Sequence, residues 1–220
     1  MTARGGDQVI PRPRDWRPGR TASWQGRTLP LLGVADVEAR LARYEPVDIV
    51  RGPPVDRAPA QGPASAVLVA LYDGPDGATT ILTKRPAHMR KHAGEIAFPG
   101  GAIDDTDADP WAAAVREAHE EVGIEPSAVE VMGFLDPIHT VEFTLFVVPV
   151  VGWMHSRPEF VPSEREVAKL LEPTLEELTD EDRWRFEVWR DHRVWFYDID
   201  GEVLWGATAY MTRLLLGLET

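Results

Sequence analysis

Hydrophobic residues recur along this chain at two different spacings, and each spacing predicts a different element. Apolar residues follow helical spacing from Val34 to Tyr44, which predicts a short amphipathic helix over residues 34–45. Residues 66–72 form a β-type run, and residues 79–83 read as its hairpin partner across a Gly/Pro/Asp turn. Between the helix and the hairpin, five prolines predict an irregular connector.

Later segments continue the alternation of strands and helices. They predict a short run at 95–98 that leads into a glycine turn, a helix from about 111, and strands near 129–135 and 144–151. An acidic loop then enters a strand and a short helix by about 178. The chain ends with a hairpin of 195–199 and 202–205 and a helix over 207–218. Mixed strands with helices on two faces predict an α+β fold, an α/β/α sandwich around a mixed β-sheet. We expect residues 1–60 to form an N-terminal extension and residues 61–220 to form the main domain.

The most informative pattern is Arg-Glu-x-x-Glu-Glu at residues 116–121. On a helix, Glu117 and Glu121 lie one turn apart, with Cβ atoms roughly 5–6 Å from each other. Glu120 lies beside them, and Arg116 stands one turn before Glu120, where it can pair with it. Three carboxylates on one face repel each other unless a cation lies among them. Mg²⁺ held by carboxylates and substrate phosphates is the usual arrangement.

The rest of this helix and its approach support a site. The apolar residues occupy a different face, which predicts that the carboxylates do not point into the core: Trp111, Val115, Ala118 and Val122. Upstream, Phe98-Pro99-Gly100-Gly101 is a turn signal followed by an Asp-rich loop. Asp109 is a candidate N-cap, and Pro110 suits the first turn. A solvated acidic face would be the better interpretation of an isolated helix, and the surrounding turn and loop argue against it.

Composition excludes several classes of function. The 220 residues are 44% hydrophobic and include no cysteine, which excludes disulfides and thiolate chemistry. The apolar runs are too short to span a bilayer and no hydrophobic signal peptide opens the chain, so we expect a cytoplasmic protein with no membrane partner. A net charge of −13 argues against a nucleic-acid surface, but it does not exclude a small anionic substrate.

Charge is distributed unevenly along the chain. Residues 1–30 hold six arginines against Asp7 and Asp15, a net charge of +4 that leaves −17 for the remainder. This basic leader has three interpretations: a flexible arm, a lid that contributes to phosphate binding, or an ordered N-terminal tie. For want of a motif, we favour a partly ordered arm without a specific function.

The acidic helix resembles the signature of the Nudix hydrolases. The matching positions are Arg116, Glu117, Ala118, Glu120, Glu121, Gly123 and Ile124. The chain departs from the usual box at two points: the spacing from Gly101 to Arg116 is one residue longer, and Asp107 stands where a glutamate is expected. Neither departure touches the metal-binding half. The resemblance implies the Nudix-type α/β/α sandwich over residues 61–220.

An upstream block resembles the extended motif of the coenzyme A diphosphatase branch, which shares the longer loop. The matching residues run Ile81-Leu82-Thr83-Lys84-Arg85, Arg90, Gly94 and Phe98-Pro99-Gly100-Gly101. Ile81 replaces a leucine and Pro86 replaces a serine or alanine. Leu204-Trp205-Gly206-Ala207-Thr208-Ala209 also resembles this branch. The resemblance covers the chain from about Ala66 to its end in three blocks.

These blocks indicate candidate residues for metal binding and catalysis. We expect Glu117 and Glu121 to bind the metal directly, with Glu120 as a further ligand or the partner of Arg116. By resemblance, the carbonyl of Gly101 completes the Mg²⁺ or Mn²⁺ coordination. We expect the general base to be Glu117 itself or an acid of the Glu164/Glu166 loop. The expected catalytic residues are therefore Glu117, Glu120 and Glu166.

The residues before the glycine turn are the candidates for substrate binding. Arg85, Arg90 and His92 have spacing suited to phosphates or to the body of coenzyme A. Their alternative interpretation is ordinary surface charge. Glu95 is placed either to join the metal shell or to bond the turn backbone.

Three functions are compatible with this set. The leading one is metal-dependent hydrolysis of coenzyme A or acyl-CoA to 3′,5′-ADP and 4′-phosphopantetheine or its acyl form. The second is the same chemistry on ADP-ribose or another nucleoside diphosphate derivative. The third is a nucleotide-binding regulator without catalysis, against which the intact acid set counts. The expected partner is a small CoA-like nucleotide, with no nucleic acid, and a homodimer is left open.

Overall fold

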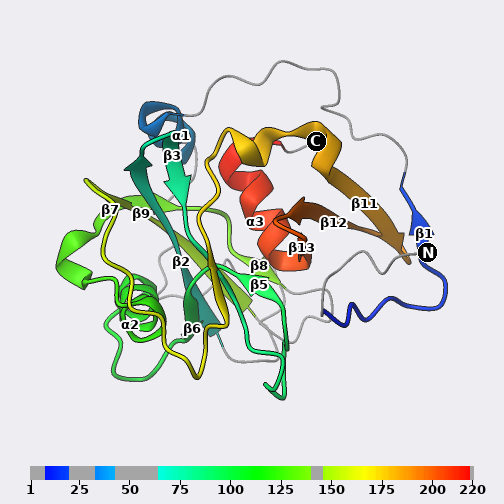
Figure 1. Ribbon diagram of the computed structural model, residues 1–220, viewed down its shortest axis with the longest axis horizontal. Helices are drawn as coiled ribbons and strands as arrows, with labels where there is room; N and C mark the ends of the chain where they lie inside the picture. The colour runs from blue at the N-terminus through cyan, green and yellow to red at the C-terminus, as the bar shows by residue number, and fades with distance from the viewer. Residues whose placement is uncertain (1–7, 20–32, 43–63, 140–145, 219–220) are drawn as a thin grey trace, which may run out of the picture.

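The computed structural model describes residues 8–19, 33–42, 64–139 and 146–218, and Figure 1 shows how their elements are arranged. A six-stranded sheet forms the centre. Its strands are β3 (Gly77–Thr80), β2 (Ala64–Gly74), β9 (Phe146–Met154) and β7 (Glu130–Phe134) in that order, with β6 (Gly100–Ala102) paired to β2 and β8 (Ile138–His139) paired to β9. β2 and β9 run parallel and the other pairs run antiparallel, so the sheet is mixed, as predicted.

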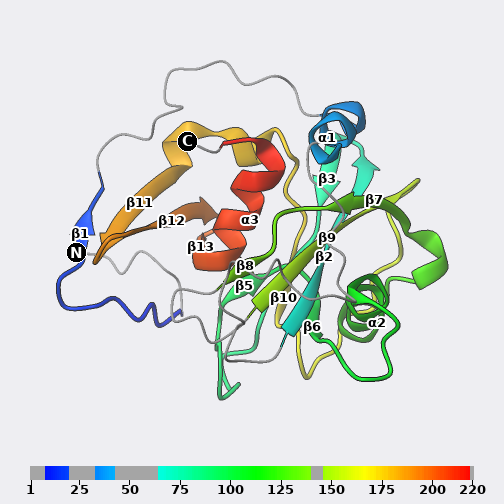
Figure 2. The same cartoon turned by 180° about the vertical axis from the view of Figure 1, so that it is seen from behind.

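Helices cover both faces of this sheet because its long strands are apolar on both sides. Along β2, Leu68 and Ala70 belong to a core cluster with α2 (Pro110–Val122). Val69 and Leu71 alternate with them and belong to a second cluster, which includes α1 (Val34–Leu41) and α3 (Gly206–Leu216). Successive strand residues point to opposite faces, so one strand contributes to both cores. The predicted α/β/α sandwich is confirmed, and Figure 2 shows it from behind.

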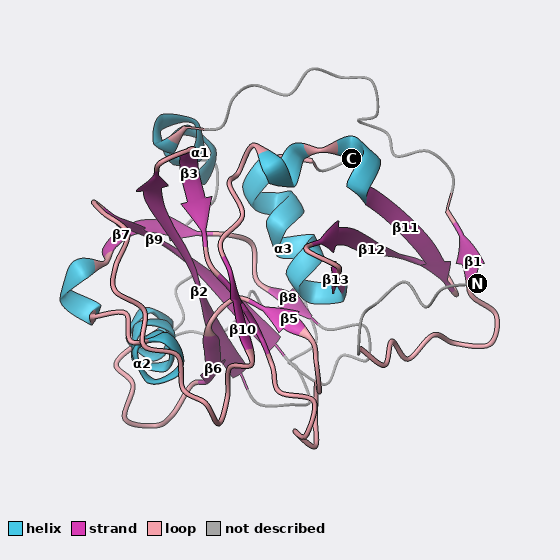
Figure 3. Cartoon of the chain, viewed as in Figure 1, coloured by secondary structure: helices cyan, strands magenta, loops and turns pink. Residues whose placement is uncertain are grey.

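Two smaller sheets complete the structure, and Figure 3 distinguishes their strands from the helices. A three-stranded sheet consists of β10 (Lys169–Leu171), β4 (Leu82–Lys84) and β5 (Ile96–Ala97). The C-terminal sheet consists of β1 (Arg17–Pro18), β11 (Trp184–Trp189), β12 (His192–Ile199) and β13 (Glu202–Trp205). Short 3₁₀ helices lie at Pro126–Ala128, Glu177–Thr179 and Glu181–Arg183.

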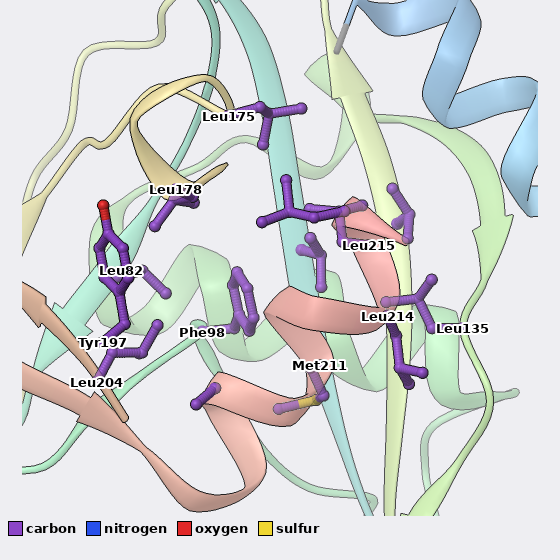
Figure 4. Packing of buried hydrophobic residues seen from close by; sticks show 14 of the residues in the cluster. Leu82, Phe98, Leu135, Leu175, Leu178, Tyr197, Leu204, Met211, Leu214 and Leu215 are labelled. Carbon is purple, nitrogen blue, oxygen red and sulfur yellow. The ribbon is translucent and has the colours of Figure 1, made fainter. Parts of the chain in front are cut away.

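The larger core cluster joins these sheets through α3, as Figure 4 shows. Met211 and Leu214 of α3 belong to the same cluster as Tyr197 of β12 and Phe98. Phe98 is 1% exposed and immediately precedes Pro99-Gly100-Gly101. Its burial fixes the chain just before β6, which borders the candidate site. The turn predicted at Gly100-Gly101 is therefore wrong, because these residues pair with β2 as a strand.

The first hairpin differs from the prediction. β2 continues to Gly74 and β3 begins at Gly77, so only Pro75 and Asp76 lie between the paired strands. The predicted hairpin is confirmed, but the bounds of its second strand, 79–83, are wrong, because the chain leaves the central sheet after Thr80 and enters β4. Ile81 packs in the cluster of α2, whereas Leu82 packs in the cluster of α3. The chain crosses between the two cores at this point.

The other predicted elements occur with shifted ends. Helix 34–45 is present as α1, which ends at Leu41 with Ala42 as its C-cap. Residues 43–63, which include the proline-rich connector, lie outside the described residues. The strand near 129–135 is β7, and the strand near 144–151 is β9, which extends to Met154. β11 was missed entirely, and β12 begins three residues before the predicted hairpin strand.

Residues 8–19 lie against the C-terminal sheet. Gln8 Nε2 donates to the carbonyl of Val203 at 2.8 Å, and Arg17 pairs with Val188 in the β1–β11 ladder. Of the three interpretations of the basic leader, these described residues support an ordered tie. No helix within the described ranges is long and apolar enough to cross a membrane.

Candidate active site

Helix α2 presents the acidic residues and has a defined start and end. Asp109 caps its N-terminus, because the carboxylate accepts a hydrogen bond from the Ala112 N–H at 2.8 Å. Gly123 ends it with a left-handed φ of 75°, and its N–H donates to the carbonyl of His119 at 2.9 Å. The predicted cap and helix are therefore confirmed, and the acidic residues occupy its last two turns.

The three glutamates differ in exposure. The Glu120 side chain is 57% exposed and that of Glu117 is 18% exposed, whereas that of Glu121 is only 5% exposed. The expectation that the carboxylates do not point into the core is wrong for Glu121. Glu121 lies three residues after Ala118, which is fully buried, and this spacing places it on the covered side of the helix.

Strand β6 covers Glu121 and contacts Glu117. The Gly100 N–H donates to Glu121 Oε2 at 3.3 Å. A Cβ atom on Gly101 would lie 2.5 Å from the carboxyl carbon of Glu117, so glycine at this position lets the carboxylate lie directly against β6. The structure thus places Gly101 beside Glu117. Whether its carbonyl binds a metal stays a prediction.

Arg116 holds the loop before the helix. Its Nε and Nη2 donate to the two oxygens of Asp107 at 3.0 and 2.9 Å, and its Nη1 donates to Glu117 at 2.8 Å. The contact with Glu120 that the sequence predicted is present at 3.5 Å and is longer than the others. Arg116 lowers the pKa of Asp107, so this aspartate performs the pairing expected of the glutamate it replaces.

Glu166 reaches the site from the loop between β9 and β10. The backbone N–H of Ser163 donates to the backbone carbonyl of Glu121 at 2.8 Å. Within the loop, the backbone N–H of Glu166 donates to the carbonyl of Ser163 at 3.0 Å. The Glu166 carboxylate is near enough to contribute to raising the pKa of both Glu117 and Glu121. The loop that carries Glu166 therefore lies against the end of α2, and a catalytic role for Glu166 stays a prediction.

Arg85 is the candidate substrate residue closest to the acidic helix. Its Nη1 lies 3.7 Å from Glu121 Oε1. His92 and Glu95 pair with each other at 2.9 Å, and this hydrogen bond raises the pKa of His92. The Glu95 side chain thus bonds His92 in place of the turn backbone, and whether it joins a metal shell stays a prediction. Arg90 is exposed and makes no ion pair with any acid of the described part.

The donor set fits a divalent cation by its chemistry. Burial raises the pKa of Glu121 to about 7 and also raises that of Glu117, and the neighbouring carboxylates add to both shifts. The ligands at this site would be carboxylate oxygens, and a bound cation would stabilise their charged form. Oxygen ligands of this kind suit Mg²⁺ or Mn²⁺. Among residues that the structure describes, no three acidic or histidine side chains converge around one point. Glu117 and Glu120 contact Arg116 instead.

Sequence reasoning missed one polar group beside the site. Arg157, Glu172 and Tyr72 form a hydrogen-bonded network at the start of the loop that carries Glu166. No motif marks these three residues, because they come from separate elements and meet only in the folded chain.

Known proteins are similar to this chain in sequence. A family model described as NUDIX domain matches residues 62–196. The chain is 42% identical over 167 residues to the uncharacterized Nudix hydrolase NudL of Shigella flexneri, which covers 74% of this chain and 86% of that protein. NudL of Escherichia coli strain K12 is 41% identical over the same length and coverage. The solved Nudix hydrolase RenU of M. smegmatis is 26% identical over 53% of this chain and 73% of its own, with a TM-score of 0.45. This chain belongs to the Nudix hydrolases, enzymes that act on phosphoric anhydrides.

Proposed function

We propose that this Nudix hydrolase cleaves the diphosphate of coenzyme A or its acyl derivatives, releasing 3′,5′-ADP and 4′-phosphopantetheine or its acyl form. The position of Arg85 carries the proposal. This arginine belongs to the upstream block that resembles the CoA diphosphatase branch, and its guanidinium lies 3.7 Å from the buried carboxylate of Glu121. A cationic group from the substrate motif therefore borders the acidic helix.

Arg85 has unused donors for a phosphate. Its Nε is buried and has no hydrogen-bond partner in the described part of the chain. Buried donors are normally paired, so a substrate oxygen at this point would satisfy an otherwise unmet requirement. The backbone N–H of Arg85 donates to the backbone carbonyl of Glu95 at 2.9 Å. This bond closes the loop that carries Arg90 and His92. These residues are the candidates for contacting the 3′-phosphate and the pantetheine arm.

Glu117, Glu120 and Glu121, with the carbonyl of Gly101, would hold Mg²⁺ or Mn²⁺. When bound, the ion neutralises the diphosphate and lowers the pKa of the attacking water. Glu166 is our candidate for the general base. Its carboxylate accepts a proton as the water oxygen bonds to phosphorus and the bridging P–O bond breaks. Glu166 is preferred to Glu164 because its carboxylate acts electrostatically on Glu117 and Glu121, whereas Glu164 is exposed.

A product-resolved assay tests the substrate. CoA, 3′-dephospho-CoA, ADP-ribose and a nucleoside triphosphate are compared with Mg²⁺ and with Mn²⁺. A charged contact to the 3′-phosphate contributes about 1.5–3 kcal/mol, so CoA should exceed 3′-dephospho-CoA in kcat/KM by roughly tenfold to a hundredfold. Arg90→Ala should impair CoA hydrolysis more than ADP-ribose hydrolysis, and Arg85→Ala is its companion. If ADP-ribose is the better substrate and both variants ignore the 3′-phosphate, the CoA assignment fails and the diphosphatase assignment remains.

The metal and the base are tested separately. Exhaustive chelation should abolish turnover, and Mg²⁺ or Mn²⁺ should restore it; full activity in chelator would rule out the metal-dependent mechanism. Glu166→Gln should lower kcat by about 10²–10⁴-fold, the usual contribution of a general base. Glu164→Gln is the matched control from the same loop. Equal losses in the two variants would contradict the assignment of Glu166.

A further inference from the structure

We propose that Arg157 and Glu172 are positioning residues for Glu166. Their ion pair holds the 155–168 segment in place and thereby holds the Glu166 carboxylate over the acidic helix. This inference rests on the proposed role of Glu166 as the base.

The second half of the 155–168 segment is tied by backbone hydrogen bonds. The N–H groups of Val161 and Ser163 donate to the last carbonyls of α2 at 2.9 and 2.8 Å, and the Ala168 N–H donates to the carbonyl of Lys84 at 2.8 Å. A Cβ on Gly123 would lie 3.0 Å from that of Val161, which shows how closely the segment approaches the helix. Within the described chain, residues 155–160 have no such backbone bonds. Side chains must therefore fix the first half.

Arg157 provides that attachment. Its Nε and Nη2 donate to the two carboxylate oxygens of Glu172, each at 2.7 Å, in a bidentate fork. The same guanidinium lies 4.9 Å from the ring centre of Phe160. Because Glu172 directly follows β10, the fork joins the two ends of the segment that contains Glu166.

The fork is itself anchored to the central sheet. The Tyr72 hydroxyl donates to Glu172 Oε2, and Tyr72 is 1% exposed at the end of β2. Arg157 lowers the pKa of Glu172, so this carboxylate is ionised and acts as the common acceptor of both donors. A continuous set of contacts thus runs from Tyr72 through Glu172 to Arg157 and Phe160.

The fork is too exposed to contribute much to global stability. The Arg157 side chain is 51% exposed and that of Glu172 is 29% exposed, and ion pairs at the surface stabilise folds only weakly. Catalysis is more sensitive to geometry, because displacing a catalytic group by about 1 Å can cost about 100-fold in rate. Loss of the fork should therefore reduce catalysis far more than stability.

A double-mutant cycle separates positioning from a general structural effect. Arg157→Ala should lower kcat by about 10- to 100-fold at nearly constant KM, with a melting temperature lowered by no more than about 4 °C. In a Glu166→Gln background the same change should lower kcat by less than about twofold, since the displaced group is already inactive. Arg157→Lys, which keeps the charge but not the fork, should recover part of the loss. Glu172→Gln should reproduce the effect if Arg157→Ala folds poorly.

Arg185→Ala is the matched control. Arg185 also pairs with an exposed carboxylate, Asp198 at 2.6 Å, and also lies over an aromatic ring, that of Phe196 at 5.1 Å, but it belongs to the C-terminal sheet. Its loss should leave kcat unchanged. If the kcat losses of the Arg157→Ala and Glu166→Gln variants multiply in the double variant, the positioning role is overturned and the proposed base remains. Wild-type turnover by Glu166→Gln would instead overturn the base and, with it, this inference.

Discussion

Glu121 has the least favourable electrostatic environment of the site residues. Its carboxylate is almost fully covered, yet its compensating contacts are long: the Gly100 N–H at 3.3 Å and Arg85 at 3.7 Å. Burial therefore dominates and raises its pKa to about 7. A residue in this environment is costly to the fold unless a bound cation compensates it, which is the physical reason to assign it to metal binding.

We expect Glu121→Gln to separate stability from activity in a pH-dependent way. The folded protein holds the Glu121 proton more tightly than the unfolded chain, where the pKa is near 4.5. This contribution to the free energy of unfolding is fully present below pH 4.5 and is lost as the pH rises through about 7. In chelator at pH 8, the variant should therefore be more stable than wild type by up to about 3 kcal/mol, and the difference should vanish near pH 4.5. Its hydrolase activity should collapse.

Thermal melts at the two pH values measure this difference. Glu120→Gln is the control, because that side chain is 57% exposed and does not contribute to the raised pKa of Glu121, so most of the pH dependence of stability should remain. If the two variants show the same pH dependence, the burial of Glu121 does not have the electrostatic effect assigned to it.

At the level of elements, α2 was predictable because its signals are local. Asp109, Pro110 and Gly123 mark its ends, and the spacing of its acids marks its functional face. The burial of Glu121 was not predictable in the same way. Its position next to Val122 lies at the edge of the apolar face, and only the packing of β6 determines that it is covered.

β11 was missed although its residues alternate in the way that a strand predicts. Arg185 and Glu187 alternate with apolar residues, a pattern typical of a half-exposed strand. In the structure Glu187 is only 6% exposed, since Arg12 and the rest of the 8–19 segment cover it. A contact between residues 175 positions apart leaves no local signal. The same limit applies to Arg157 and Glu172, whereas the acidic helix was recognised from its sequence alone. The predicted glycine turn was wrong, because Gly100–Ala102 pair with β2 as strand β6.

The contact between β6 and α2 leads to a test with Gly101→Ala. Gly101 does not have a positive φ, so alanine causes no backbone strain, but its Cβ would lie 2.5 Å from the Glu117 carboxyl carbon. The flexible Glu117 side chain can move away at little cost in stability. We therefore expect a nearly unchanged melting temperature and a loss of about 100-fold in kcat, because the carboxylate is displaced.

Gly33→Ala is the control for this variant. Gly33 also has no positive φ, and its Cβ would approach only Asp36, at 3.9 Å. This substitution should change neither kcat nor, by more than a few degrees, the melting temperature. Wild-type kcat in Gly101→Ala would mean that the position of Glu117 is not critical.

At the scale of the whole molecule, the N-terminal segment stabilises the C-terminal sheet. Arg12 Nε lies 2.9 Å from both oxygens of Glu187, and its guanidinium lies 5.5 Å from the ring centre of Phe196. Trp189 Nε1 donates to the same carboxylate at 2.8 Å. In Figure 1 this sheet lies on the opposite side of the molecule from α2. Part of the basic leader is thus a structural component that neutralises a buried acid.

We expect Arg12→Met to destabilise the protein without impairing its chemistry. Within the described residues, the variant leaves the Glu187 carboxylate with the Trp189 N–H as its remaining hydrogen-bond donor. Removing one partner of a buried ion pair typically costs about 3–5 kcal/mol. For a chain of this size, the melting temperature should fall by about 10 °C. Because Arg12 is far from α2, kcat at 20 °C should stay at the wild-type value.

Arg14→Met, at an exposed position of the same segment, is the control for loss of charge. In the double variant Arg12→Met/Glu187→Met, the buried charge is removed together with its partner, so most of the lost stability should return. An equal loss of stability in the Arg12 and Arg14 variants would show that net charge, not the contact with Glu187, accounts for the effect.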